Sequence, residues 1–119
     1  MTDTPAFDLE VSMHQDDPVF HLHGRLMDQQ QADRLMGALD EVLSKGHERI
    51  VLDLEKLQYM NSTGLNILIN VLTRTRNAGG DAVISGLSAS VRQLFVVTKL
   101  DSVFTIANGV EEALGKLKS

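Results

Sequence analysis

The sequence lacks several residue types and patterns, and each absence removes a class of function. It contains no cysteine, which excludes disulfide bonds, thiolate nucleophiles and cysteine-ligated metal ions. No apolar run approaches the roughly 18 residues of a membrane-spanning helix. The N-terminal stretch MTDTPAFDLE has neither the basic start nor the apolar core of a signal peptide. We therefore expect a cytoplasmic protein without a membrane span.

Positive charge is absent from the first nineteen residues, which instead carry five acidic side chains. The other hundred residues balance acidic against basic groups, so the net charge of the chain is -5. Binding of nucleic-acid phosphates requires clustered lysine and arginine, and base stacking requires aromatic rings. With no tryptophan, one tyrosine and four phenylalanines, the chain is not expected to bind nucleic acid directly.

The spacing of apolar residues predicts a domain built from strands and helices. The chain has 119 residues, of which 43% are hydrophobic and 23% are charged, as in typical single domains. Period-two alternation and short apolar runs predict strands over 7–13, 19–23, 50–54, 82–87 and 102–107. Apolar stripes at helical spacing predict helices over 28–45, 62–77, 88–100 and 109–118.

The resulting order, ββαβαβαβα, defines the fold class. Strands that alternate with helices imply a mostly parallel sheet, and the two leading strands imply an antiparallel β-hairpin. We expect a single α/β domain over residues 1–119, with a mixed, mostly parallel sheet and about four helices packed on it. Residues 1–6 are expected to form a flexible N-terminal end.

The stretch YMNSTGLNIL, residues 59–68, is the first candidate for a functional site. Four of its residues contribute little to a core: Asn61, Ser62, Thr63 and Gly64. Asparagine, serine and threonine are favoured N-caps, so a capping role worth about 1 kcal/mol would explain them. However, the junction follows a predicted strand and opens a helix, which is where open α/β sheets place their binding sites.

The helix that follows carries an uncharged polar stripe, formed by Asn66, Asn70, Thr73 and Asn77. Amides and hydroxyls suit a surface that another protein covers, because no charge has to be desolvated. The start of this helix also suits a phosphate, since unpaired N–H groups and the macrodipole favour negative charge there. Phosphorylated Ser62 would carry about −1.5 to −2 charges and would exclude a partner fitted to a neutral hydroxyl.

Two other arrangements have simpler explanations than chemistry. Asp53 and Glu55 flank the same junction, but a nucleophilic serine needs a positioned base, and this stretch contains no histidine. We interpret both carboxylates as the charged end of a buried strand. His21 and His23 share one strand face, a spacing that zinc sites also use. Further ligands would have to come from distant residues, so we expect a solvated strand face and no metal site.

Nearly the whole chain resembles a known family. It is similar to STAS domains (sulfate transporter and anti-sigma factor antagonist) through two long segments, GRLMDQQQADRLMGALDEVLSKGHERIVLDLEKLQYMNSTGLNIL and RNAGGDAVISGLSASVRQLFVVTKLDSVFTIANGVEEAL. The strongest marker is a buried strand and short loop, followed by two hydroxyl residues and a glycine that open a helix. The small-residue turn NAGGD and the Leu-Asp-x-x-Phe pattern of LDSVF add to the resemblance.

The resemblance implies a function for the junction. In stand-alone antagonists the first hydroxyl residue accepts a phosphoryl group; here that residue is Ser62, with Thr63 as the alternative. The unphosphorylated protein would bind an anti-sigma factor of the histidine-kinase-like ATPase type and free its sigma factor. That partner would phosphorylate Ser62, and a PP2C-like phosphatase would reverse the step. The chain would be a binding module that needs no cofactor, not an enzyme.

The resemblance also implies a docking surface around Ser62. Its expected members are Arg25, Met27, Asp28, Asn61, Ser62, Thr63, Gly64, Asn66 and Asn70. Asn61 and Thr63 would frame and cap the helix start, and Gly64 would give the partner close access to the backbone. Two residues depart from the family pattern: Asn61 stands where aspartate is common, and Lys99 where glycine is frequent. The first change removes a charge beside Ser62, which bears on recognition by the kinase.

Two alternative functions are compatible with the same residues. A constitutive STAS subunit, such as the soluble component of a lipid-transport ATPase complex, would dock permanently through this helix. A small serine hydrolase would use Ser62 as a nucleophile and would turn over activated esters.

Overall fold

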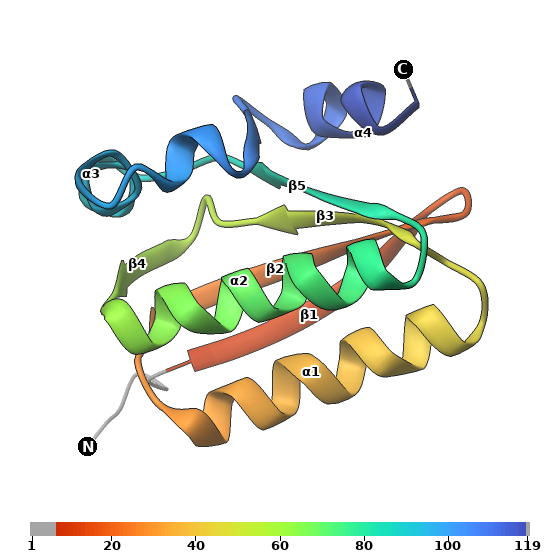
Figure 1. Cartoon of the computed structure of the whole chain (residues 1–119), viewed down its shortest axis with the longest axis horizontal. Helices are drawn as coiled ribbons and strands as arrows, with labels where there is room; N and C mark the ends of the chain where they lie inside the picture. Colours follow the sequence, from red (N-terminus) through yellow and green to blue (C-terminus); the bar gives the residue numbers. More distant parts are fainter. Residues whose placement is uncertain (1–6, 119) are drawn as a thin grey trace.

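Within residues 7–118, which the computed structural model describes, a mixed sheet of six strands forms the centre of the molecule (Figure 1). β1 (Phe7–His14) and β2 (Asp17–Leu26) form an antiparallel hairpin. The sheet continues in parallel from β2 through β3 (Arg49–Asp53), β5 (Asp81–Ser85) and β6 (Thr105–Ala107). The short strand β4 (Leu57–Met60) pairs in parallel with the second half of β2. The flexible end expected for residues 1–6 lies outside the described residues.

Helices cover both faces of this sheet. α1 (Gln29–Ser44) and α2 (Ser62–Asn77) lie side by side on one face, and α4 (Val110–Lys118) lies on the other (Figure 1). α3 (Ala89–Val97) lies at the end of the sheet next to β4 and is followed by a 3-10 turn, Leu100–Ser102. The helix start that carries Ser62 is therefore at the same end of the molecule as α3 and β4.

Side-chain alternation along the strands divides the core between the two faces. The larger cluster, under α1 and α2, includes Phe20, Leu22, Ile50, Leu52 and Ile84. The smaller cluster, under α4, includes Val19, Val51, Val83, Ala107 and Ala113. The central strands β3 and β5 contribute to both clusters, which is why their sequences are short continuous apolar runs.

The structure confirms the fold class but contains a strand that the sequence did not predict. β4 has inward side chains only at its ends, Leu57 and Met60, with two exposed residues between them, so it has no period-two pattern. β2 also continues past Gly24, which was expected to end it. Gly24 has a φ of 87° and lies where the pairing between β2 and β4 shifts register. This bulge marks the point where β2 leaves β3 and pairs with β4.

The segment after α3 also differs from the prediction. The helix expected over 88–100 ends at Val97, and the strand expected over 102–107 begins only at Thr105. Between them Lys99 adopts a left-handed backbone, with a φ of 64°, from which the 3-10 turn begins. Glycine reaches this conformation without the steric cost that a Cβ atom brings. The backbone requirement thus explains why glycine is frequent at this position in the family that the sequence resembles.

Lys99→Gly is expected to raise the free energy of unfolding by about 0.5–1 kcal/mol. Relief of the left-handed strain stabilises the fold, and the larger entropy of glycine in the unfolded chain offsets part of that gain. Lys99→Ala is the matched control, because alanine removes the same charge but keeps the Cβ atom, so its effect should stay within about 0.5 kcal/mol. Urea denaturation measures both variants. Equal changes in the two would contradict the backbone explanation.

Candidate functional site

Asn61 caps the start of α2, directly after β4. Its Oδ1 accepts a hydrogen bond from the N–H of Gly64 at 2.9 Å, and its carbonyl oxygen accepts one from the N–H of Leu65 at 2.9 Å. Ser62 is the first residue of the helix and is exposed, whereas Thr63 is half-buried. Within residues 7–118 no group hydrogen-bonds the Ser62 hydroxyl. Capping therefore accounts for Asn61 and leaves the Ser62 hydroxyl available.

The N-terminal end of α2 carries no compensating charge. Its first turn contains no acidic side chain, so the unpaired N–H groups and the macrodipole leave a partial positive charge there. A phosphoryl group on Ser62 would lie where this field favours an anion. An aspartate in place of Asn61 would supply a negative charge at this helix start, which the neutral asparagine does not.

The loop between β2 and α1 is bound to this helix start through the same asparagine. Nδ2 of Asn61 donates to the carbonyl oxygen of Met27 at 3.3 Å. A capping box closes the loop: Oε1 of Gln31 accepts from the N–H groups of Met27 (2.6 Å) and Asp28 (3.1 Å), and Oδ1 of Asp28 accepts from the N–H of Gln31 (3.0 Å). Met27, Asp28 and Arg25 are exposed. The structure places Met27 beside Asn61 and pairs Arg25 with Tyr59 across β2 and β4. A role of these residues in docking stays a prediction.

Gly64 is buried, and its missing side chain serves packing inside the domain. A Cβ atom at this position would overlap the carbonyl oxygen of Leu26 and would lie 3.1 Å from the Cβ atom of Met60. The first turn of α2 therefore rests directly on the end of β2. This contact corrects the expectation that Gly64 gives a partner close access to the backbone.

The outward face of α2 carries the uncharged stripe that the sequence predicted. Its exposed members are Asn66, Asn70, Thr73 and Asn77, and the buried residues opposite include Leu65, Leu68 and Leu72. Nη1 of the neighbouring Arg74 donates to both carboxylate oxygens of Asp40 of α1, at 2.6 and 2.8 Å. The charge next to the stripe is therefore already paired within the domain.

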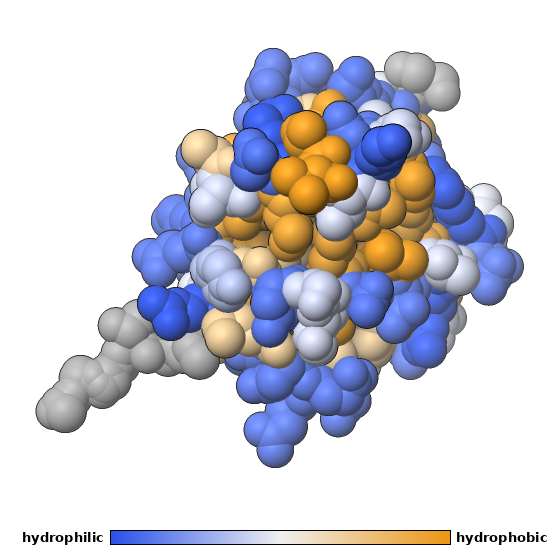
Figure 2. All heavy atoms as spheres, turned by 60° about the vertical axis from the view of Figure 1, so that its left-hand side comes forward, coloured by the Kyte–Doolittle hydropathy of each residue, from blue (hydrophilic) through white to orange (hydrophobic). Residues whose placement is uncertain are grey.

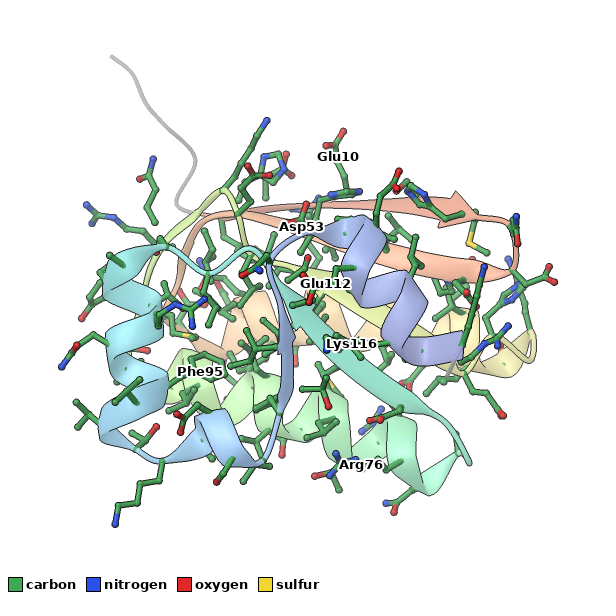
Figure 3. All side chains as sticks on the ribbon, turned by 90° about the horizontal axis from the view of Figure 1, so that it is seen from above. Glu10, Asp53, Arg76, Phe95, Glu112 and Lys116 are labelled. Atoms are coloured by element: carbon green, nitrogen blue, oxygen red, sulfur yellow. The ribbon has the colours of Figure 1, made fainter. Side chains whose placement is uncertain are left out.

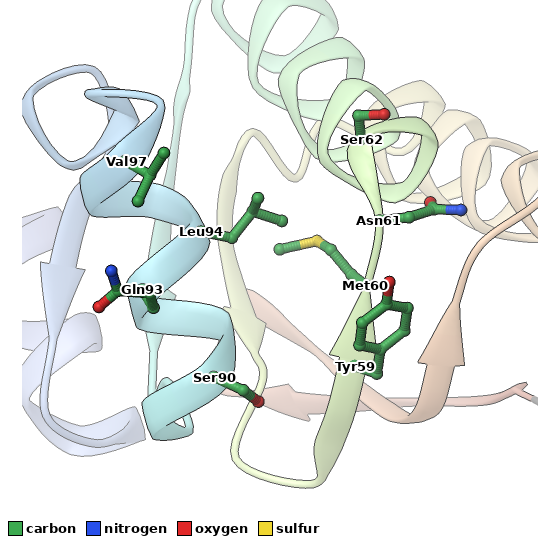
Figure 4. A pocket seen from close by; sticks show the side chains of 8 residues that line it. All are labelled: Tyr59, Met60, Asn61, Ser62, Ser90, Gln93, Leu94 and Val97. Carbon is green, nitrogen blue, oxygen red and sulfur yellow. The ribbon is translucent and has the colours of Figure 1, made fainter.

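A groove that sequence reasoning missed lies beside Ser62 (Figure 4). It has a volume of about 470 Å³ and is lined by Tyr59, Met60, Asn61, Ser62, Ser90, Gln93, Leu94 and Val97. At one end α3 is held against β4, since the Ser90 hydroxyl donates to the carbonyl oxygen of Gln58 at 3.3 Å. The four lining residues of α3 have helical spacing and could have been found in the sequence. On the opposite wall Asn61 and Ser62 were predicted site residues, but Tyr59 and Met60 were not, because β4 itself was not predicted.

A hydrogen-bonded chain on the other face of the sheet was also missed. Nε2 of His21 lies 2.8 Å from Oγ of Ser12, and Nδ1 of His21 lies 2.7 Å from Oδ2 of Asp53 (labelled in Figure 3). The chain joins β1, β2 and β3, and it depends on the register that pairs His21 with Asp53. Asp53 therefore binds His21, and neither Asp53 nor Glu55 hydrogen-bonds Ser62. Within residues 7–118 no base is therefore hydrogen-bonded to the Ser62 hydroxyl, as a base is in a nucleophilic serine site.

Two of the acidic residues near the N-terminus are paired within the domain. Nη2 of Arg34 donates to Oδ1 of Asp8 at 3.0 Å, and Nε of Arg49 donates to Oδ1 of the buried Asp17 at 3.1 Å. The backbone N–H of Leu9, followed by the Arg34 guanidinium, lowers the pKa of Asp8 below its ordinary value. These contacts neutralise part of the acidic leading segment.

No three histidine, aspartate or glutamate side chains in residues 7–118 come together as a potential metal site. Among the helices of the same residues, none combines the length and apolar character needed to cross a lipid bilayer.

Comparisons with known proteins agree with the fold. The model of the STAS domain family matches residues 8–113. A Bordetella bronchiseptica protein named as an anti-sigma factor antagonist, BtrV, is 34% identical over 88 residues, which cover 74% of this chain and 76% of that protein.

Solved structures share the same architecture. An anti-sigma factor antagonist from Mycobacterium paratuberculosis has a TM-score of 0.84 and 21% identity, covering 99% of this chain and 100% of that one. The Bacillus cell fate determinant SpoIIAA in its phosphorylated form has a TM-score of 0.71 and 18% identity, covering 92% and 98%. At these identities the likeness concerns the fold.

Proposed function

Since the chain belongs to the STAS domain family, we propose that it is an anti-sigma factor antagonist whose partner binding is switched off by phosphorylation of Ser62. In its unphosphorylated form it binds an anti-sigma factor of the histidine-kinase-like ATPase type and releases the sigma factor. The same partner phosphorylates Ser62, and a PP2C-like phosphatase restores the hydroxyl. All of these steps take place in the cytoplasm.

The observation that carries this proposal is the state of Ser62. Its hydroxyl is exposed and is not used as a helix cap, because Asn61 supplies the cap. The unneutralised helix start favours a phosphate at this position. Around it lie the anchored loop with Arg25, Met27 and Asp28 and the uncharged face of α2 with Asn66 and Asn70. A partner can cover Ser62 and the α2 face with Asn66 and Asn70 without desolvating a charge, and Arg25 and Asp28 are charged groups that it can pair.

Phosphorylation of Ser62 is tested by mass spectrometry. The chain is incubated with its cognate kinase-type anti-sigma factor and ATP, and its intact mass is then measured. We expect the mass to increase by one phosphate in the original chain and in Thr63→Ala, and to stay unchanged in Ser62→Ala. An increase that persists in Ser62→Ala would place the acceptor elsewhere, with Thr63 as the nearest hydroxyl.

Co-purification of the chain with its partners distinguishes the switch from permanent docking. A complex that ATP dissociates supports the antagonist. If the chain stays unphosphorylated in an ATP-insensitive assembly with a membrane ATPase, the constitutive subunit replaces it as the function.

A further inference from the structure

The groove beside Ser62 is apolar inside and carries no charge. Met60 of β4 and Leu94 of α3 project toward each other across it, and Tyr59 and Val97 lie at its rim (Figure 4). The rim residues are 47% and 66% exposed, so large apolar groups are left in water. None of the eight lining residues is ionisable at neutral pH.

The groove lies within a wider apolar surface. Figure 2 shows apolar side chains gathered on the end of the molecule where α3 and β4 lie. Met27, in the loop bound by Asn61, is 37% exposed. Exposed apolar surface of this kind marks sites of protein contact, because covering it removes apolar area from water.

We propose that this groove receives large uncharged apolar side chains of the anti-sigma factor when that partner covers Ser62. The inference rests on the proposed function. Its basis is continuity: Asn61 and Ser62 belong both to the docking surface and to the lining of the groove, so a partner in contact with Ser62 also lies over the groove. The uncharged lining selects apolar groups, because a charged side chain would lose its hydration without gaining a counter-charge.

The groove also gives a physical reason for the switch. A phosphate on Ser62 would stand at the edge of the groove, where the entering apolar side chains would have to displace its water. Removing water from a group with about −1.5 to −2 charges is unfavourable. The phosphate therefore prevents binding through the cost of its own desolvation, and no movement of the domain is required.

Two neighbouring valines of α3 provide a matched test. Val97 lines the groove and Val96 does not, yet both are exposed residues of the last turn of the same helix. Val97→Asp is expected to weaken binding of the cognate kinase-type anti-sigma factor at least tenfold, and Val96→Asp less than threefold, by isothermal titration calorimetry. Thermal denaturation of each variant confirms that the domain is folded.

The outcomes separate this inference from the proposed function. Equal affinities of the two valine variants, with an original chain that binds, would overturn the groove alone. An original chain that binds no anti-sigma factor would overturn both proposals. A photoreactive benzophenone side chain at position 97 gives a second readout. A crosslink to an apolar segment of the anti-sigma factor supports the inference, and a crosslink to a second copy of this chain overturns it.

Discussion

Gly64→Ala is expected to destabilise the domain by about 3 kcal/mol or more. The added Cβ atom would overlap the carbonyl oxygen of Leu26, a β2 residue that pairs with Met60 of β4. A backbone oxygen cannot rotate away as a side chain can, so the first turn of α2 would have to lift from the sheet. That movement would also break the cap between Asn61 and the N–H at position 64.

Gly37→Ala is the matched control for this prediction. Gly37 lies within α1, and a Cβ atom there would meet nothing within 4 Å. Alanine is the better helix former by about 0.8–1 kcal/mol, so this variant should be more stable than the original. Both substitutions place alanine in a helix, and the difference between them isolates the contact with Leu26. Urea denaturation measures it, and a loss below about 1 kcal/mol for Gly64→Ala would contradict the close packing.

Ser62→Asp is expected to weaken binding of the anti-sigma factor at least 100-fold while leaving the thermal midpoint nearly unchanged. The aspartate lies at an exposed position at the start of α2, where negative charge is favourable by about 0.3–1 kcal/mol, so the fold keeps its stability. At the interface the same carboxylate would have to be desolvated against an uncharged surface, which is costly. Calorimetric titration gives the affinity, and thermal denaturation gives the midpoint.

Two further variants make this result specific. Ser62→Ala should bind as tightly as the original chain but should no longer respond to ATP. Ala89→Asp places the same charge at the first position of α3, which is also exposed and follows a capping serine, and should leave affinity within about threefold. A large fall in the thermal midpoint of Ser62→Asp would indicate that the hydroxyl has a structural role instead.

The long elements were predictable because their side chains repeat a pattern over several turns or strand residues. The helices that became α1 and α2 and the strand that became β3 have such patterns and lie where the sequence placed them. β4 has only four residues and no alternation of buried and exposed side chains. It forms because β3 does not pair with the second half of β2, which leaves that edge open to β4. α3 is followed by a left-handed backbone at Lys99. Lysine has no preference for this conformation, so the sequence did not indicate where α3 ends.

Some residues of the site can be predicted from local sequence, and others come together only through long-range contacts. Ser62 and the exposed stripe could be predicted, because the sequence of one helix contains them. The bond from Asn61 to Met27 joins residues 34 positions apart, and the chain from Ser12 through His21 to Asp53 spans three strands. Only strand order and register bring these groups together. The role of Gly64 was misjudged for this reason, since the atom that it accommodates belongs to Leu26.

The two hydrogen bonds of the Asn61 side chain limit how partner specificity can change among related proteins. Because one side-chain amide hydrogen-bonds both the loop at Met27 and the first turn of α2, a backbone shift in either segment would disturb the bond to the other. We therefore expect changes in partner specificity to occur at the outward side chains of these segments, such as Arg25 and Asn66. Related proteins that exchange these side chains would bind different partners and would keep the same backbone around Asn61.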